Sequence, residues 1–275
     1  MSNLDWNKTK TIFIAVFLIL NIFLYMLYLN RYTEAQNVET QILGEKTIEA
    51  RLKDDNITYG VLPSNIESAT YISAKVHHFT DKDFTNNNQQ VTIKDDVHAV
   101  VTFAEPLKLP NINTELSFTE FLKTNVYEGA SYALWTIDHE ERVAIFFQKA
   151  NNRMFYYNKR GLLKVYWNAE NEITMYEQTM VDNIEEMEQQ ENVLPPLQIL
   201  QALYVKGILK QDSHITQVRL GYSALVYLTQ TQVLVPTWEV QVKLSDGNVE
   251  EYFVNAVDGK MIEIQVDMQE EDLES

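Results

Sequence analysis

The sequence lacks cysteine and contains few glycines, and each shortage excludes a class of function. With no cysteine among 275 residues, the chain has no disulfide framework, no thiolate metal site and no cysteine nucleophile. Its 8 glycines include no G-x-G-x-x-G or G-x-x-x-x-G-K spacing, which disfavours a nucleotide-binding loop. Basic residues are also scarce, 22 against 39 acidic ones, and a net charge of −17 would repel a phosphate backbone. We therefore expect no nucleic-acid partner.

Motifs for catalysis and metal binding are also missing. The sequence has neither Gly-x-Ser-x-Gly nor Ser-x-x-Lys, which disfavours the serine hydrolases. None of the 5 histidines stands in an H-E-x-x-H motif, and the adjacent His77 and His78 should point to opposite faces of a strand. A carboxylate-based hydrolase stays open, although no long loop system surrounds two acids to form a cleft. We expect a non-enzymatic protein with no catalytic residues, no metal and no cofactor.

One long apolar run is present near the N-terminus. Residues 11–30 carry no charge between Lys10 and Arg31, and twenty helical residues span about 30 Å, the thickness of a bilayer's hydrocarbon core. A buried core helix would keep a polar stripe, and a cleaved signal peptide would have a shorter apolar region followed by a small-x-small site. The run therefore predicts one transmembrane helix at 11–30 that stays on the protein as a signal anchor.

The charges beside this run predict its orientation. Lys8 and Lys10 precede it, whereas only Arg31 follows closely, so residues 1–10 should be cytoplasmic and the C-terminal domain extracellular. Removing Lys8 and Lys10 from the 22 basic residues, and Asp5 from the 39 acidic ones, leaves 20 against 38, a charge of −18 beyond residue 30. An acidic, cysteine-free outer domain suits the surface of a bacterial cell membrane.

The remainder predicts a stalk at 31–62 and a first α+β unit at 63–181. Short runs rich in aromatic and β-branched residues are typical of strands, and Ser117-x-x-Glu120 resembles a capping box that opens a helix at 117–126. The strands are expected at 69–79, 91–103, 132–137, 143–148, 154–157, 162–167 and 173–180.

A second α+β unit is expected at 182–266, followed by an acidic tail at 267–275. Five acidic residues between Asp182 and Glu191, and then Pro195-Pro196, indicate the boundary. A helix at 196–209 opens the unit, and Asp246-Gly247 and Asp258-Gly259 indicate tight hairpins. Its strands are expected at 215–220, 224–228, 237–244, 249–255 and 260–266. The predicted fold is a tandem of two related units, each an antiparallel sheet with a helix, although such thin similarity also arises by chance.

Asn21 is the one amide within the predicted membrane helix before its last residue. An amide in hydrocarbon pairs with polar groups on other helices, so this face is a candidate partner-binding surface. The alternative is a single tolerated amide in a long apolar helix. Residues at three- and four-residue spacing share its face, and the predicted partner-binding set is Phe17, Leu18, Asn21, Leu24, Tyr25 and Tyr28.

Several segments along the chain resemble the YycI (WalI) regulatory proteins of low-GC Gram-positive bacteria. They are Asp5-Trp6-Asn7-Lys8-Thr9-Lys10 with the apolar run that follows, Ile42-Leu43-Gly44-Glu45-Lys46, Val235-Pro236-Thr237-Trp238-Glu239-Val240, and Tyr252-Phe253-Val254-Asn255-Ala256-Val257-Asp258-Gly259. The last hairpins also resemble the repeat of PepSY-type extracytoplasmic domains, over a shorter stretch.

The YycI resemblance implies a non-enzymatic accessory of the WalK (YycG) sensor histidine kinase. It implies action together with the sister protein YycH (WalH), contact through the membrane helix, and control of cell-wall metabolism. The PepSY-like hairpins leave a second hypothesis open, an extracytoplasmic binding module or inhibitor of a wall hydrolase or protease.

Overall fold

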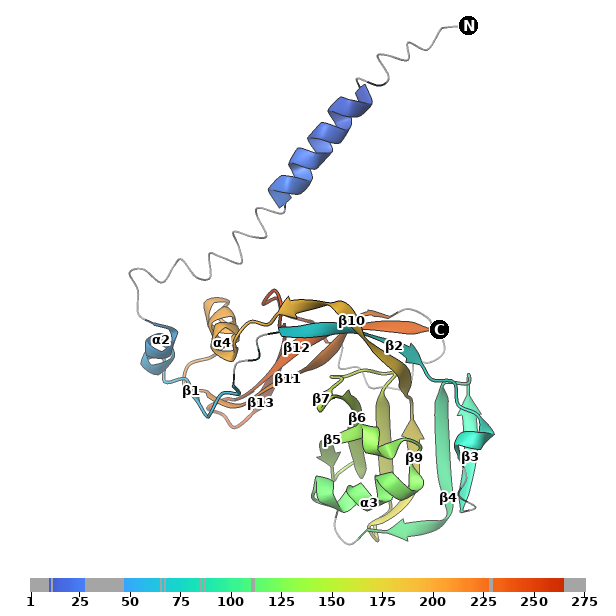
Figure 1. Ribbon diagram of the computed structural model, residues 1–275. Helices are drawn as coiled ribbons and strands as arrows, with labels where there is room; N and C mark the ends of the chain where they lie inside the picture. The colour runs from blue at the N-terminus through green and yellow to red at the C-terminus, as the bar shows by residue number, and fades with distance from the viewer. Residues whose placement is uncertain are drawn as a thin grey trace, which may run out of the picture. The chain divides into compact units, whose positions relative to one another are not determined.

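The computed structural model describes residues 10, 12–27, 47–64, 66, 68–84, 86, 88–109, 112–227 and 230–264. The chain divides into two compact units, residues 1–56 and 57–275 (Figure 1). We call the described part of the second unit, within 57–264, the two-sheet body.

The first unit contains a helix at 12–27 and helix α2 (Ile48–Asp54), whose N-cap Thr47 accepts a hydrogen bond from the Ala50 N–H at 3.4 Å. Within the described residues, no helix meets the length and hydropathy needed to cross a membrane. Residue 11 and residues 28–30 of the predicted span lie outside the described part, as do residues 31–46 of the predicted stalk.

The two-sheet body confirms the predicted α+β class, with two largely antiparallel sheets and few helices. Its elements are β1 (Thr58–Tyr59), β2 (Ser68–Val76), η1 (Asp81–Asp83), β3 (Gln89–Lys94), β4 (His98–Lys108), α3 (Glu115–Asn125), η2 (Gly129–Ser131), β5 (Tyr132–Asp138), β6 (Val143–Ala150), β7 (Arg153–Met154), β8 (Leu162–Trp167), β9 (Glu172–Gln178), β10 (Val181–Asn192), α4 (Pro196–Val205), β11 (His214–Tyr227), β12 (Thr231–Lys243) and β13 (Val249–Asn255).

The first sheet has the strand order β1-β11-β12-β2-β10, and β13 also pairs with β12. Strand β12 is long enough to hold two neighbours on one side, β2 along residues 231–234 and β13 along residues 237–243. Both of its faces are covered, since residues 234–240 are all buried. Trp238, on this strand, is fully buried and its indole N–H donates to the Leu194 carbonyl at 2.9 Å. Strand β12 is therefore the central strand of this sheet.

The second sheet has the order β3-β4-β9-β8-β6-β5, with β7 beside β6, and helix α3 covers one face. Strand β8 alternates half-buried and buried residues, so that Leu163, Val165 and Trp167 reach the core under α3. Helix α3 begins at Glu115, one residue after Thr114, rather than at the predicted capping box. The Ser117 hydroxyl instead lies 2.9 Å from the Thr114 hydroxyl, inside the first turn.

The sheets divide the chain differently from the predicted tandem of 63–181 and 182–266. Strand β2, from the first predicted range, pairs with β12 and β10, which fall in the second range apart from Val181 at the start of β10. The second sheet uses only residues 89–178 and is inserted between β2 and β10. The acidic stretch that was predicted to be a domain boundary forms strand β10. Most of the side chains on this strand are exposed, so the carboxylates remain in water within a regular strand. In the described part of the predicted strand 260–266, only a bridge between Val254 and Met261 forms.

Candidate interaction surfaces

The helix at 12–27 exposes its apolar side chains. Its large hydrophobic residues are between 46% exposed, at Leu27, and 71% exposed, at Phe13. Soluble proteins rarely leave a contiguous apolar surface uncovered, and such patches mark contacts with a membrane or another protein. This helix is therefore the first candidate surface.

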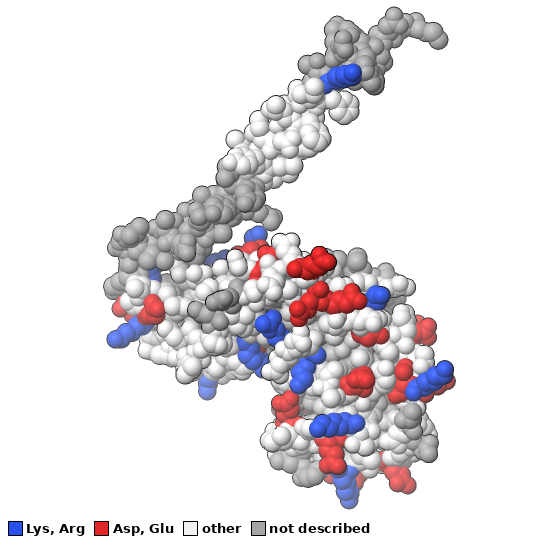
Figure 2. Space-filling view, viewed as in Figure 1, with Lys and Arg blue, Asp and Glu red and all other residues white. Residues whose placement is uncertain are grey.

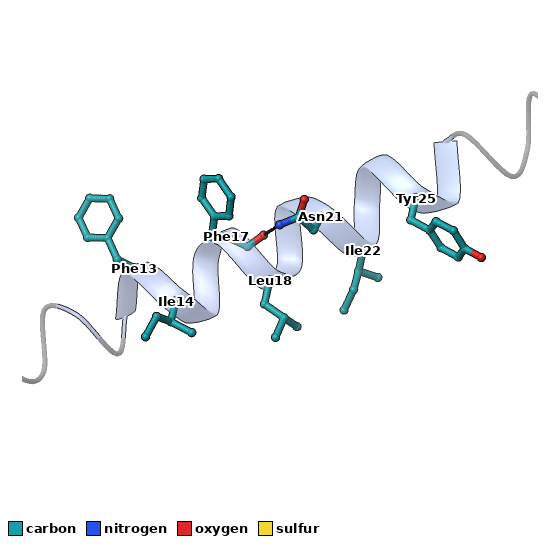
Figure 3. A pocket seen from close by; sticks show the side chains of 7 residues that line it. All are labelled: Phe13, Ile14, Phe17, Leu18, Asn21, Ile22 and Tyr25. Atoms are coloured by element: carbon teal, nitrogen blue, oxygen red, sulfur yellow. Dashed lines mark hydrogen bonds between the residues drawn. The ribbon is translucent and has the colours of Figure 1, made fainter.

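Asn21 satisfies part of its hydrogen-bonding capacity within the helix. Its side-chain Nδ2 donates to the Phe17 carbonyl at 2.9 Å (Figure 3). The amide therefore has a partner without a second helix, and its oxygen and second N–H remain for another contact. A shallow depression along this face is lined by Phe13, Ile14, Phe17, Leu18, Asn21, Ile22 and Tyr25.

The predicted partner-binding residues are distributed around this depression. Phe17, Leu18, Asn21 and Tyr25 line it, whereas Leu24, 52% exposed, does not. Tyr28 lies outside the described residues. That this face binds a partner stays a prediction.

In the two-sheet body, the loop between β7 and β8 joins the sheets. Phe155 is fully buried in the core of the first sheet, and the Tyr156 N–H donates to the Tyr222 carbonyl of β11 at 2.8 Å. Gly221 permits this approach, because a Cβ there would lie 2.5 Å from both the Met154 carbonyl oxygen and the Tyr156 ring. The loop therefore inserts against the first sheet and anchors the second sheet to it.

An ion pair between a partly exposed arginine and a buried glutamate lies beside this loop. The Arg219 guanidinium binds the Glu239 carboxylate through two N–H groups, at 2.7 and 3.1 Å, and lies over the Trp135 ring. Burial raises the pKa of Glu239, whose side chain is 0% exposed, and Arg219 opposes that rise. Tyr157, at a left-handed φ of 49°, donates its hydroxyl proton to Glu251 at 2.8 Å. These contacts fasten β5 and the β7–β8 loop to β11, β12 and β13.

Side-chain amides fasten the crossover from β9 to β10. Gln148, 1% exposed, donates from Nε2 to the Val181 carbonyl at 2.7 Å and accepts from the Val181 N–H at 2.9 Å. The buried Asn158 amide donates to Gln232 at 2.8 Å. Because buried polar groups without partners are costly, this network holds one specific arrangement of the two sheets.

The histidines of the described residues do not assemble a metal site. His77 Nδ1 lies 2.9 Å from Asp182, and its Nε2 lies 3.6 Å from Asp83. Its ring stacks on Tyr127, with the centroids 5.2 Å apart. Among the described residues, no group of three or more metal-binding side chains lies together. His77 is therefore part of the junction between the sheets.

Strand β10 is the acidic edge of the first sheet. It pairs with β2 alone, and two register irregularities interrupt that pairing. Figure 2 shows carboxylates, in red, gathered over the surface where Figure 1 places β10. Its acidic residues are Asp182, Glu185, Glu186, Glu188 and Glu191.

Sequence reasoning missed the contacts that join the sheets. Tyr157 and Glu251 are 94 residues apart, and Asn158 and Gln232 are 74 apart. No spacing rule connects such positions. The one available signal is the aromatic run at 155–157 beside Asn158, which was predicted only as a strand.

Comparisons with known proteins define the chain's class. The sequence model described as YycI protein matches residues 36–257. No curated protein matches the sequence. An uncharacterised Eubacterium rectale protein of known crystal structure is 12% identical, covering 77% of this chain and 92% of that one, with a TM-score of 0.47. The C-terminal domain of Bacillus megaterium YpeB is 11% identical, covering 70% and 88%, with a TM-score of 0.42.

The described residues form a two-sheet α+β body and a separate apolar helix. The match covers most of the chain, so the chain belongs to the YycI family. Membership in this accessory family suggests a regulatory role in the WalK/YycG system.

Proposed function

We propose that this protein is a membrane-anchored, non-enzymatic regulator of the WalK/YycG sensor histidine kinase and acts with YycH (WalH) to control cell-wall metabolism. The observation that carries the proposal is the family match over residues 36–257. The exposed helix at 12–27 supports it, because apolar side chains on a helix surface need a membrane or a partner helix to cover them.

In the proposed mechanism, the helix packs against kinase helices and biases the kinase between two signalling arrangements. A regulator shifts such an equilibrium only by as much as its affinities for the two arrangements differ. The face of Phe17, Asn21 and Leu24 is the proposed contact, and extracytoplasmic contacts of the two-sheet body add to it.

Co-purification from membranes tests the partner. Tagged full-length protein should recover the kinase and YycH, and the triple variant Phe17→Ala, Asn21→Leu, Leu24→Ala should recover less kinase. The matched control is Ile12→Ala, Ile19→Ala, Phe23→Ala, which removes apolar side chains of similar exposure from the other side of the helix. Equal recovery with both triples would refute the helix contact, and no recovery with the unmodified protein would refute the kinase partnership. Capture of a wall hydrolase or protease instead would favour the binding-module hypothesis.

The proposed location is the cell membrane, with a single pass, a cytoplasmic N-terminus and an extracellular body. The chain has no cysteine, so single cysteines report accessibility without background. A membrane-impermeant maleimide applied to intact protoplasts should label Ser245→Cys, in an exposed turn, and leave Ser2→Cys unlabelled until lysis. The opposite labelling would refute the orientation.

A further inference from the structure

His77 lies where the chain passes between the two sheets. Strands β2 and β10 pair with each other as they lead from the first sheet to the second (Figure 1). His77 follows β2 directly, and its N–H donates at 2.9 Å to the carbonyl of Met180, in the crossover from β9 to β10. Its ring stacks on Tyr127, which follows α3, and meets the Phe79 ring edge-on at 4.8 Å between centroids. The ring therefore contacts every segment that meets at this end of the junction.

Two carboxylates face the two nitrogens of this ring. Nδ1 lies 2.9 Å from the carboxylate of Asp182 on β10, and Nε2 lies 3.6 Å from that of Asp83 in η1. The His77 side chain is 13% exposed and the Asp83 side chain 17% exposed, so both are largely shielded from water. Burial, and then the charges of Asp83, Glu128 and Asp182, raise the pKa of the Tyr127 hydroxyl, so Tyr127 stays neutral and only acidic charges surround the ring.

Asp83 is positioned by contacts that do not involve the ring. Its carboxylate accepts a hydrogen bond from the Thr80 N–H at 2.7 Å and another from the Thr80 hydroxyl at 3.1 Å. These bonds hold the carboxylate at the start of η1, on the side that faces Nε2. The acceptor is therefore in place beside the ring before any bond to the ring forms.

The contact with Asp182 determines where the neutral ring carries its hydrogen. A carboxylate only accepts hydrogen bonds, so Nδ1 carries the hydrogen and Nε2 carries a lone pair. That lone pair faces the Asp83 carboxylate, and Nε2 is buried without a hydrogen-bond partner. A buried polar atom without a partner is costly. A second proton on the ring makes Nε2 a donor that faces a ready acceptor.

We propose that His77 is a pH-sensitive switch at the junction of the two sheets. In the neutral state the ring binds Asp182 alone, and in the protonated state Nε2 also binds Asp83 and draws η1 against β10. Histidine side chains ordinarily change charge between about pH 5 and pH 8, so the junction is tighter in mildly acidic surroundings. The inference goes beyond the proposed function and requires no partner protein.

Spin labelling of the full-length protein in detergent tests the switch. The chain has no cysteine, so Lys82→Cys, at an exposed position of η1, carries the only label. We expect this label to lose mobility as the pH falls from about 8 to about 5. A label at Ser245→Cys, in an exposed turn, reports the effect of pH on the label itself and should not change. No change at residue 82, or equal changes at both positions, would overturn the proposal.

Substitutions at the junction identify the titrating group. His77→Gln stays neutral over this range and still has an N–H for Asp182, so the label at residue 82 should keep one mobility. Asp83→Asn keeps an oxygen for Thr80 but loses the charge, and should abolish most of the response. Asp81→Asn, the matched control, removes an exposed charge from the same turn and should leave the response unchanged. A response that persists in His77→Gln, or that is equal in the two aspartate variants, would overturn the proposal.

Two further measurements keep the result decisive. Circular dichroism at both pH values shows whether each variant is folded, and if His77→Gln is unfolded, Asp83→Asn against Asp81→Asn decides. Nuclear magnetic resonance of ¹⁵N-labelled histidine follows the ring itself, whose signal is identified by its loss in His77→Gln or, failing that, by its shift in Asp83→Asn. It should pass from the Nδ1–H form to the doubly protonated form over the pH range in which the label loses mobility. Protonation of His77 without a change at residue 82 would overturn the switch, and none of these results depends on the kinase.

Discussion

The helix at 12–27 and the two-sheet body use the same apolar residue types in opposite ways. In the helix, Phe17 and Leu18 are 63% and 56% exposed, whereas Phe146 and Leu163 in the body are 0% exposed. The body closes its own cores through sheet pairing and two covering helices, and it adds a buried polar network at the junction. The apolar side chains of the helix are removed from water only where a membrane or a partner covers them. Substitutions in the body should therefore change folding, and substitutions in the helix should change association.

The largest effect is expected at the central strand of the body. Trp238→Ala removes a fully buried ring and its hydrogen bond to Leu194, and should lower the free energy of unfolding by about 3–5 kcal/mol. Urea unfolding of the full-length protein in detergent, followed by circular dichroism, measures this. Trp135→Phe, at a half-buried ring, is the matched control and should cost less. Equal losses would contradict the central place of β12.

The next effect is expected at the ion pair that joins the sheets. Arg219→Ala leaves the Glu239 carboxylate buried without its cation and should cost about 2–3 kcal/mol, below the range for a fully buried pair because Arg219 is 43% exposed. Adding Glu239→Gln removes the buried charge and should restore part of the loss. Unfolding of both single variants and the double variant forms a double-mutant cycle. A purely additive result would show that the pair does not hold the junction.

The difference between the two regions also explains what could be predicted from the sequence. The helix at 12–27 and strands such as β8 and β13 depend on local periodicity, so their residues identify them directly. The nested order of the sheets depends on β2 pairing with β10 and β12, more than a hundred residues away, which local patterns do not encode.

The acidic strand β10 shows the limit most clearly. Five carboxylates between Asp182 and Glu191 are typical of a solvated linker, yet they occupy an edge strand whose side chains point to water. The junction contacts Gln148–Val181 and Arg219–Glu239 likewise had no local signal, because a single glutamine or arginine is common on any surface. Of the candidate surfaces, the sequence predicted the helix face and missed the acidic edge strand β10.

A smaller effect is expected at Asn21, where the contrast between the exposed helix and the two-sheet body predicts a change in association alone. Asn21→Leu removes the amide and should weaken helix contacts by about 0.6–2 kcal/mol while leaving urea unfolding of the body unchanged. Kinase recovery from membranes and body unfolding are measured on the same preparation. Val16→Leu, on the same helix, is the control. A loss of body stability in Asn21→Leu would contradict the separation of the two regions.

The smallest effect is a pH dependence within the second sheet. The neighbouring His98 ring, 3.7 Å away, lowers the pKa of Glu177 below its ordinary value, and Lys164 and Lys94 act in the same direction. A carboxyl whose pKa is lower in the folded state stabilises the fold above its unfolded pKa, and this contribution is lost as pH falls through the folded pKa. Glu177→Gln should therefore lose less stability than the unmodified protein between neutral pH and pH values below the ordinary glutamate pKa, and the difference should be small because the two groups lie 3.7 Å apart. Urea unfolding across that pH range measures the difference, with Glu170→Gln in an exposed turn as the control. The same pH slope in all three proteins would show that the His98–Glu177 contact does not contribute to folding.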